Sequence, residues 1–301
     1  MRPLLAAAVV VLATLGCSRE PRAGRGGAAA PRTRANLRFE LVNPGPEPVL
    51  ALRKAERTIR ARLEQGAIRG ATVRLEDRII VVALPLMTEV EIQAVRLLIL
   101  PEGRLELRLV SETAHPLLGL AELVDGGHAP GIALHRGGNP ADLQFDASNP
   151  TAFRSWLGSV RSSLRPDDGR AFRFEDTKAG VRAYLIEPEL LLSGASIFDA
   201  QTVDDNDLPA VRIYLDSAGA EALEELSAQY RGRRLAVLLD ERVLVAVRIR
   251  DRIRGGQALI TLGENARGGN AKADAARLAA LLRAGALPGP LRELASGAPT
   301  R

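Results

Sequence analysis

Apolar and polar residues alternate along residues 37–42, where the sequence reads LRFELV. This two-residue period is typical of a β-strand that is buried on one face. After a turn at residues 43–46, the apolar period lengthens to three or four positions, which predicts a helix that packs along one side and ends at Gly66. The inner face of this helix is defined by Leu52, Ala55, Ile59 and Leu63.

Two further strands are predicted at residues 71–75 and 78–84, and a second helix is predicted to begin at Thr88. A glutamate three residues after Thr88 has the spacing of a capping box, in which the hydroxyl and the carboxylate each accept a hydrogen bond from a free backbone N–H. A last strand at residues 104–110 completes the order β-α-β-β-α-β. This order predicts a ferredoxin-like base over residues 37–110.

Residues 111–190 interrupt the pattern with many glycines and prolines, and we predict only a helix there, at residues 151–164. Regular periods return over residues 190–263. The elements expected there are a strand at 210–215, a helix beginning at Asp216, a hairpin of strands 235–239 and 243–249, and a strand at 258–262. The stretch 111–263 is therefore predicted to be a head inserted into the base, made of an irregular insert and a regular core.

The final helix is predicted over residues 270–284, with Asn270 as its N-cap and Gly285 just past its end. We expect the segment 264–291 to bring this helix back to the base, and residues 292–301 to form a tail. The predicted fold class is thus α+β, a ferredoxin-like βαββαβ base with an inserted α+β head subdomain.

The first residues have the pattern of a targeting segment. Arg2 precedes an apolar run over residues 4–15, and twelve residues rise only about 18 Å as a helix, short of the roughly 30 Å hydrocarbon core of a membrane. We interpret residues 1–17 as a signal peptide that ends in the lipobox-like sequence TLGC. The lone cysteine, Cys17, is expected to be lipidated; plain secretion and a retained membrane anchor are the alternatives. Residues 18–36 are expected to form a disordered linker.

Length and composition allow one large domain or two small ones, because the chain has 301 residues of which 46% are hydrophobic. The formal net charge is +5, and 38 of the 41 basic residues are arginines, since only three lysines occur. The linker 18–36 holds five arginines and one glutamate, a net charge of +4 (5 − 1), so the rest of the chain is close to neutral. A nucleic-acid partner is therefore not expected.

The spacing typical of a catalytic or cofactor site is missing from the sequence. His115, His128 and His135 all fall in the insert without cysteine partners, so we interpret them as loop residues and expect no metal. Residues 204–207 (DDND) lack the alternating ligands of a calcium loop and are expected to form a polar turn. Trp156 is expected in the core of the insert. No enzymatic activity and no cofactor are expected.

The end of the chain carries the most specific family signal. Residues 281–291, LLRAGALPGPL, resemble the sequence that closes the first periplasmic domain of SecD, a subunit of the Sec protein-export motor. Further family motifs precede it in the same order, at residues 192–200, 211–220, 232–240 and 253–261. The motif residues that carry the resemblance are Gly194, Asp240, Gly255, Gly256, Arg283, Gly285 and Pro288.

The sequence also departs from this family. SecD carries a D-x-x-GG motif before the first strand, whereas residues 31–36 read PRTRAN. After residue 17 no apolar run is long enough to match the transmembrane bundle that couples SecD to protons. The hairpin turn Asp240-Glu241 lacks glycine at its second place, so we expect a turn other than the two-residue type I′ turn. The resemblance thus implies a soluble, lipoprotein-like version of the domain without the transmembrane bundle.

The resemblance implies an accessory role in protein export by passive binding of translocating or unfolded polypeptide. The expected partners are exported polypeptides and components of the Sec translocase, together with a membrane reached through the lipid anchor. We expect the protein on the periplasmic side of the cell envelope, with the insert 111–190 as the region that holds polypeptide. The alternative is a repurposed envelope lipoprotein that acts as a protein–protein interaction module in another complex.

Overall fold

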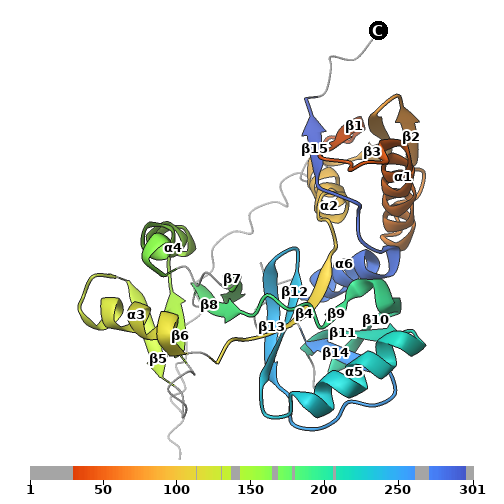
Figure 1. Cartoon of the computed structure of the whole chain (residues 1–301). Coiled ribbons are helices and arrows are strands. Elements are labelled where there is room, and N and C mark those ends of the chain that lie inside the picture. Colours follow the sequence, from red (N-terminus) through yellow and green to blue (C-terminus); the bar gives the residue numbers. More distant parts are fainter. Residues whose placement is uncertain are drawn as a thin grey trace, which may run out of the picture. The chain divides into compact units, whose positions relative to one another are not determined.

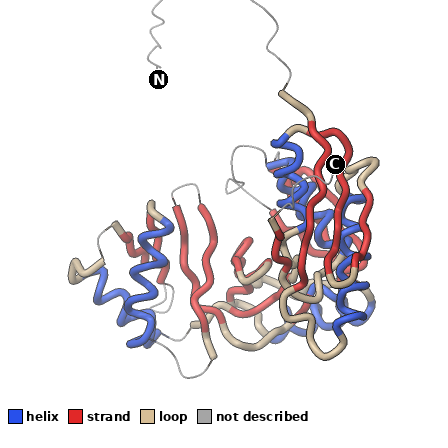
Figure 2. Tube along the Cα trace, turned by 90° about the horizontal axis from the view of Figure 1, so that it is seen from above, coloured by secondary structure: helices blue, strands red, loops and turns tan. Residues whose placement is uncertain are grey.

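The computed structural model describes residues 30–112, 114–129, 131–136, 143–164, 169–177, 180–205, 208–261 and 271–295. Cys17, most of the linker, Asn270 and the second half of the 204–207 turn lie outside these ranges. The described residues form helices and antiparallel sheets, so the predicted α+β class is confirmed. Figure 1 labels the elements, and Figure 2 distinguishes helices from strands by colour.

The base is a four-stranded antiparallel sheet in the order β15-β1-β3-β2, which packs against helices α1 and α2. Its elements are β1 (Thr33–Leu41), α1 (Pro48–Gln65), β2 (Thr72–Glu76), β3 (Ile79–Met87), α2 (Glu89–Ile99) and β15 (Leu291–Leu294). The four apolar positions predicted for the inner face of α1 are all buried. The capping box is present: Thr88 N–H donates to Glu91 Oε2 at 2.7 Å, and Glu91 N–H donates to Thr88 Oγ1 at 3.3 Å.

The predicted limits of the base were wrong at three places. The strand expected to complete it at 104–110 is β4 (Leu105–Leu109), which pairs with β12 (Arg234–Leu239) in a sheet of the head. Its place beside β1 is taken by β15, from the region predicted to begin the tail. The linker also ends earlier, because Thr33 already pairs with Met87 of β3. Alternation predicts a strand and its buried face, but it does not specify the partner strand.

The head core contains two sheets, β13-β12-β4-β9 and β10-β11-β14, packed with α5 and α6 around one apolar cluster. Its remaining elements are β9 (Leu192–Ser193), the 3₁₀ turn η1 (Gly194–Ser196), β10 (Ile197–Asp205), β11 (Leu208–Leu215), α5 (Ser217–Gln229), β13 (Arg242–Arg248), β14 (Gln257–Thr261) and α6 (Ala271–Ala284). The carboxylate of Asp216 caps α5, accepting from the Gly219 N–H at 2.8 Å.

Helix α6 contacts both parts of the fold. Ala275, Leu278 and Leu282 are buried in the head core against β10 and β11, whereas Leu281 packs with Leu98 of α2. The helix thus returns to the base as expected, and it also packs into the head core, which was not expected. Its apolar residues occupy more than one side, which allows it to pack against two neighbours.

The expectation of an irregular insert was wrong, because residues 111–190 contain a sheet of their own, β5-β6-β8-β7, with two helices (Figure 1). The elements are α3 (Ala114–Asp125), β5 (Ile132–Arg136), β6 (Leu143–Ala147), α4 (Pro150–Leu164), β7 (Ala171–Thr177) and β8 (Gly180–Ile186). Helix α4 confirms the helix predicted at 151–164. Trp156 packs against the insert's own core, with its ring stacked 6.1 Å from that of Phe153, as expected.

The turn between β12 and β13 differs from the prediction. Leu239 pairs with Arg242, so the loop has two residues, and φ is +49° at Asp240 and +68° at Glu241. Two positive φ values define the type I′ geometry, which was not expected without a glycine. Asp240 is anchored from outside the hairpin: its carboxylate accepts from the N–H groups of Gly103 and Arg104, at 3.1 and 2.8 Å. These hydrogen bonds offset the strain of a left-handed conformation.

Candidate functional site

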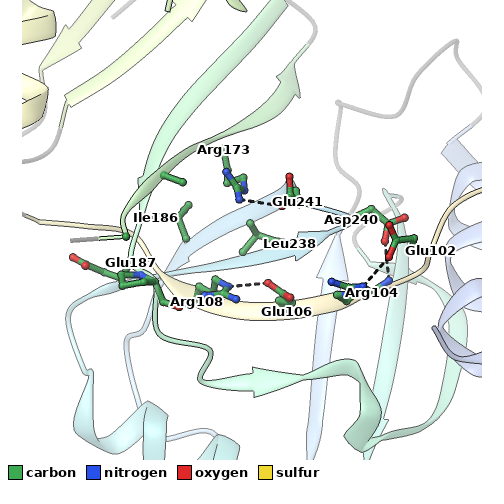
Figure 3. Close-up of a pocket in the computed structure, with 13 residues that line it drawn as sticks. Glu102, Arg104, Glu106, Arg108, Arg173, Ile186, Glu187, Leu238, Asp240 and Glu241 are labelled. Carbon is green, nitrogen blue, oxygen red and sulfur yellow. Dashed lines mark hydrogen bonds and ion pairs between the residues drawn. The ribbon is translucent and has the colours of Figure 1, made fainter. Parts of the chain in front are cut away.

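A cleft of about 440 Å³ follows the outward face of β4 (Figure 3). The leucines of this strand point into the head core, so the residues between them point to the opposite face. These residues line the cleft together with two that precede the strand: Glu102, Arg104, Glu106 and Arg108. One strand therefore presents a row in which negative and positive side chains alternate.

The insert and the β12–β13 turn supply the rest of the wall. Ala171 and Arg173 come from β7, Pro188 follows β8, and Glu241 belongs to the turn. Arg173 Nη2 lies 3.2 Å from Glu241 Oε1, so an ion pair joins the insert to the head at this point. The cleft is thus built from residues that are more than 130 positions apart in the sequence.

Within the wall, each cation of the β4 row has an acidic neighbour. Arg104 Nη2 donates to Glu102 Oε2, and Arg108 Nε donates to Glu106 Oε2, both at 2.8 Å. Arg108 also donates to the backbone carbonyl of Pro188. Because these pairs are partly exposed, each contributes only about 0–1 kcal/mol. A bound chain with charges of either sign can therefore exchange with them at low cost.

Two apolar side chains, Leu238 and Ile186, complete the lining. Both belong to a buried cluster that joins β12 and β13 of the head to β8 of the insert. The cleft therefore combines a charged rim with an apolar floor, which suits contact with both the charged and the apolar side chains of a polypeptide.

Two hydrogen-bonded polar pairs lie on the insert sheet, which supplies part of the cleft wall. The Tyr184 hydroxyl donates to Glu175 Oε2 at 2.7 Å, and burial together with the nearby Glu175 carboxylate raises the pKa of Tyr184 above its ordinary value of 10. Arg182 donates to both oxygens of Asp146, at 2.9 and 3.0 Å, which raises the pKa of the guanidinium. Both shifts favour the protonation state that each group already has at neutral pH.

Most of the family-motif residues are glycines at positions with a positive φ or a close contact. Of the seven, only Asp240 lines the cleft. Gly256 has a φ of +65°, and a Cβ on it would lie 2.7 Å from the Cβ of Ala220. Gly194 approaches Leu105 so closely that a Cβ would lie 3.0 Å from the leucine Cβ. Gly285, at φ +79°, ends α6. Arg283 is exposed, Pro288 is half-buried, and Gly255 has a φ of +82° with open space around it.

The arginines and glutamates of the cleft were missed by the sequence analysis. The signal was present, since charged residues at 102, 104, 106 and 108 alternate with apolar ones along a predicted strand. No role was predicted for them, because that strand was placed in the base. Only the pairing of β4 with β12 brings this face against the insert.

The structure does not bring the histidines together. His128 is exposed, and His135 Nε2 lies 3.4 Å from Asp146 Oδ2, whereas His115 belongs to α3. Asp204 and Asp205 end β10. Across the described ranges, no group of three or more His, Cys, Asp or Glu side chains is placed to hold a metal ion.

These features define an α+β domain with a head and a base, and residues 170–289 match the family model described as the P1 head subdomain of SecDF. The resemblance to the first periplasmic domain of SecD is therefore confirmed. The matched region includes β7, the β12–β13 turn and α6, so it contains most of the cleft wall other than β4.

Two curated relatives extend this match. The protein translocase subunit SecDF of Thermus thermophilus is 35% identical over 161 residues, which cover 53% of this chain and 21% of that protein. The protein translocase subunit SecD of Calditerrivibrio nitroreducens is 30% identical over 192 residues, which cover 60% of this chain and 34% of that protein. The chain thus spans about a third or less of the length of these relatives.

Two solved structures have the same fold. A structure described as a membrane component SecDF that enhances protein export aligns with a TM-score of 0.56 at 24% identity, over 86% of this chain and 97% of that one. SecDF in a super-membrane-facing form aligns with a TM-score of 0.58 at 24% identity, over 87% of this chain and 30% of that one. Within the part of the chain that the structure describes, no helix is both long and apolar enough to cross a membrane.

Proposed function

We propose that this protein assists protein export by holding translocating or unfolded polypeptide in the cleft beside β4. The observation that carries the proposal is the composition of the cleft, in which weakly held charges of both signs surround an apolar floor. Such a lining favours weak binding without a sequence motif, because side chains of either charge and apolar side chains all find a partner. The relatives, which are protein translocase subunits, support the same role.

The proposed binding is passive and involves no covalent step. The raised pKa values of Tyr184 and Arg182 keep both groups protonated at neutral pH, and the motif glycines allow backbone conformations and close contacts. Accordingly the protein is proposed to act as a binding module and not as an enzyme. Removal of a proton gradient is expected to leave its affinity for unfolded chains unchanged.

The cellular place of the protein is proposed from its sequence and its relatives. We propose that the chain reaches the periplasmic side of the envelope through the signal peptide 1–17 and is held at a membrane by a lipid on Cys17. Components of the Sec translocase are the proposed partners, by analogy with the relatives.

The test measures binding of a permanently unfolded chain, reduced and carboxymethylated α-lactalbumin, by fluorescence anisotropy. Ala171→Trp places a large ring in the cleft wall and is expected to weaken binding about tenfold, an effect of about 1.4 kcal/mol. The control is Ala228→Trp on the exposed side of α5, which is expected to bind like the wild type. Thermal unfolding of both variants is measured, and each is expected to remain folded.

Two outcomes would contradict the proposal. Equal binding by both variants would show that polypeptide is held elsewhere. If the wild type binds no unfolded chain and instead retains one folded envelope protein, the interaction-module alternative replaces the export role.

A further inference from the structure

The outward face of α1 carries a row of exposed cations. Arg53, Lys54 and Arg57 are exposed, and Arg57 lies four positions after Arg53 and three after Lys54, so it neighbours both on the surface of the helix. Among the residues that the structure describes, no carboxylate lies within 4.0 Å of any of them, whereas their neighbour Arg60 pairs with Glu56 at 2.7 Å. The row therefore forms a local positive surface on a chain whose folded part is close to neutral.

Exposed apolar side chains lie beside this row. Val49 is 64% exposed and Leu50 is 56% exposed, in the first turn of α1. Leu50 lies three positions before Arg53 and seven before Arg57, so it shares the outward face of the helix with them. The opposite face of the helix is buried in the base core. One side of α1 is thus anchored, and the other presents apolar and cationic side chains to its surroundings.

This combination has the chemistry of an interfacial helix. Arginine and lysine bind the phosphates of anionic lipids, while apolar side chains enter the boundary between headgroups and acyl chains. The surface is the convex side of a helix about 27 Å long, a length set by 18 residues at about 1.5 Å each. A convex face offers no groove or free strand edge for an extended peptide, whereas it can lie along a bilayer.

We propose that the outward face of α1 docks on an anionic phospholipid bilayer, with Arg53, Lys54 and Arg57 on lipid phosphates and Val49 and Leu50 in the interfacial layer. Glu47 and Glu64 are the exposed carboxylates near the two ends of the helix, and they flank the cationic row without interrupting it. This contact lies on the base and is independent of the cleft, so either proposal can fail without the other.

The test uses the full chain with Cys17→Ser, which prevents a lipid anchor from masking the contact. Sedimentation with vesicles of phosphatidylcholine and phosphatidylglycerol is compared with sedimentation with phosphatidylcholine alone. Binding is expected only to the anionic vesicles and is expected to weaken as salt is added. The triple change Arg53→Gln, Lys54→Gln and Arg57→Gln is expected to weaken it about tenfold or more.

A second triple change is the matched control. Arg212→Gln, Arg250→Gln and Arg283→Gln remove the same charge from exposed positions in the head and on α6, and they are expected to have little effect. Val49→Ser with Leu50→Ser tests the apolar part and is expected to weaken binding at unchanged net charge. All these positions are exposed, so the variants are expected to unfold at the wild-type temperature.

Three results would overturn the proposal. Equal losses in the two triple variants would show that net charge, and not this face, determines binding. Equal sedimentation with both kinds of vesicle would exclude recognition of anionic lipid. Binding to poly-glutamate but not to anionic vesicles, lost in the α1 triple variant, would assign the surface to an acidic protein partner.

Discussion

The guanidinium of Arg62 donates a hydrogen bond to the backbone carbonyl of Gly285, 223 positions later in the chain, at 3.2 Å. Arg62 is fully buried in the base, and it also donates to the carbonyls of Leu98, Ile99, Pro101 and Glu102. Residues 101–102 lie between α2 and β4, where the chain leaves the base, and Gly285 lies on the segment that returns to β15. One side chain therefore fastens both connections between the base and the head.

Replacement of Arg62 tests this role. Burial lowers the pKa of Arg62 to about 10, partly opposed by the Asp240 carboxylate, so the side chain remains charged at neutral pH. Arg62→Ala leaves several buried carbonyls without a donor and is expected to cost about 3 kcal/mol or more of the free energy of unfolding in urea. Arg57→Ala, five positions earlier on the exposed face, is expected to cost less than about 0.5 kcal/mol. Similar losses in both would contradict the role of Arg62.

The glycine pair before β14 offers a second matched comparison. Gly256→Ala introduces a Cβ 2.7 Å from that of Ala220 at a φ of +65°, so both contact and backbone conformation oppose it. We expect a loss of about 2–3 kcal/mol, against about 1 kcal/mol for Gly255→Ala, where φ is +82° but the space is open. Thermal or urea unfolding of the two variants measures the difference in stability. Equal losses of stability would mean that small movements relieve the contact between the new Cβ and Ala220.

The leucine pair near the end of α6 tests whether the family-like ending closes the fold. Leu281 is buried with Leu98, and Leu282 is buried in the head core. Leu281→Ala is expected to cost about 2–5 kcal/mol. Leu97→Ala, at a residue that is 53% exposed on α2, is the control and is expected to change stability little. A loss below about 0.5 kcal/mol at Leu281 would show that this end of α6 contributes little to the fold.

Lipidation of Cys17 remains a prediction from the sequence. Cys17→Ser is expected to abolish incorporation of labelled fatty acid and to shift the protein from the membrane fraction toward the soluble fraction. If the α1 face also docks on lipid, part of the variant stays with the membrane until the salt concentration is raised. A variant that still incorporates the label would show that Cys17 is not the modified residue.

Local sequence patterns were sufficient for most helices and strands of the base and of the head core. The apolar period of α1, the capping box at Thr88 and the alternation of residues 210–215 each depend on neighbours within a few positions, so they can be recognised in sequence. The motif at 281–291 likewise carried the resemblance to the first periplasmic domain of SecD. The burial of Arg62 could also have been predicted, because Arg62 follows Ile59 by three positions and therefore lies on the inner face of α1.

Strand pairing and the cleft beside β4 depend on contacts between segments that are far apart in the sequence. The alternation in β4 is the same whether the strand joins the base or pairs with β12, because a strand's period depends on burial of one face and not on the identity of its partner. For the same reason β15 was not recognised as the fourth strand of the base, and in the insert none of the four strands was predicted. The cleft joins residues 102–108, 169–173, 186–188 and 238–241, and long-range contacts of this kind leave no periodic trace along the chain. Sequence patterns thus predicted most elements of the base and head core and the resemblance to SecD, whereas the packing of distant segments formed the cleft and buried Arg62.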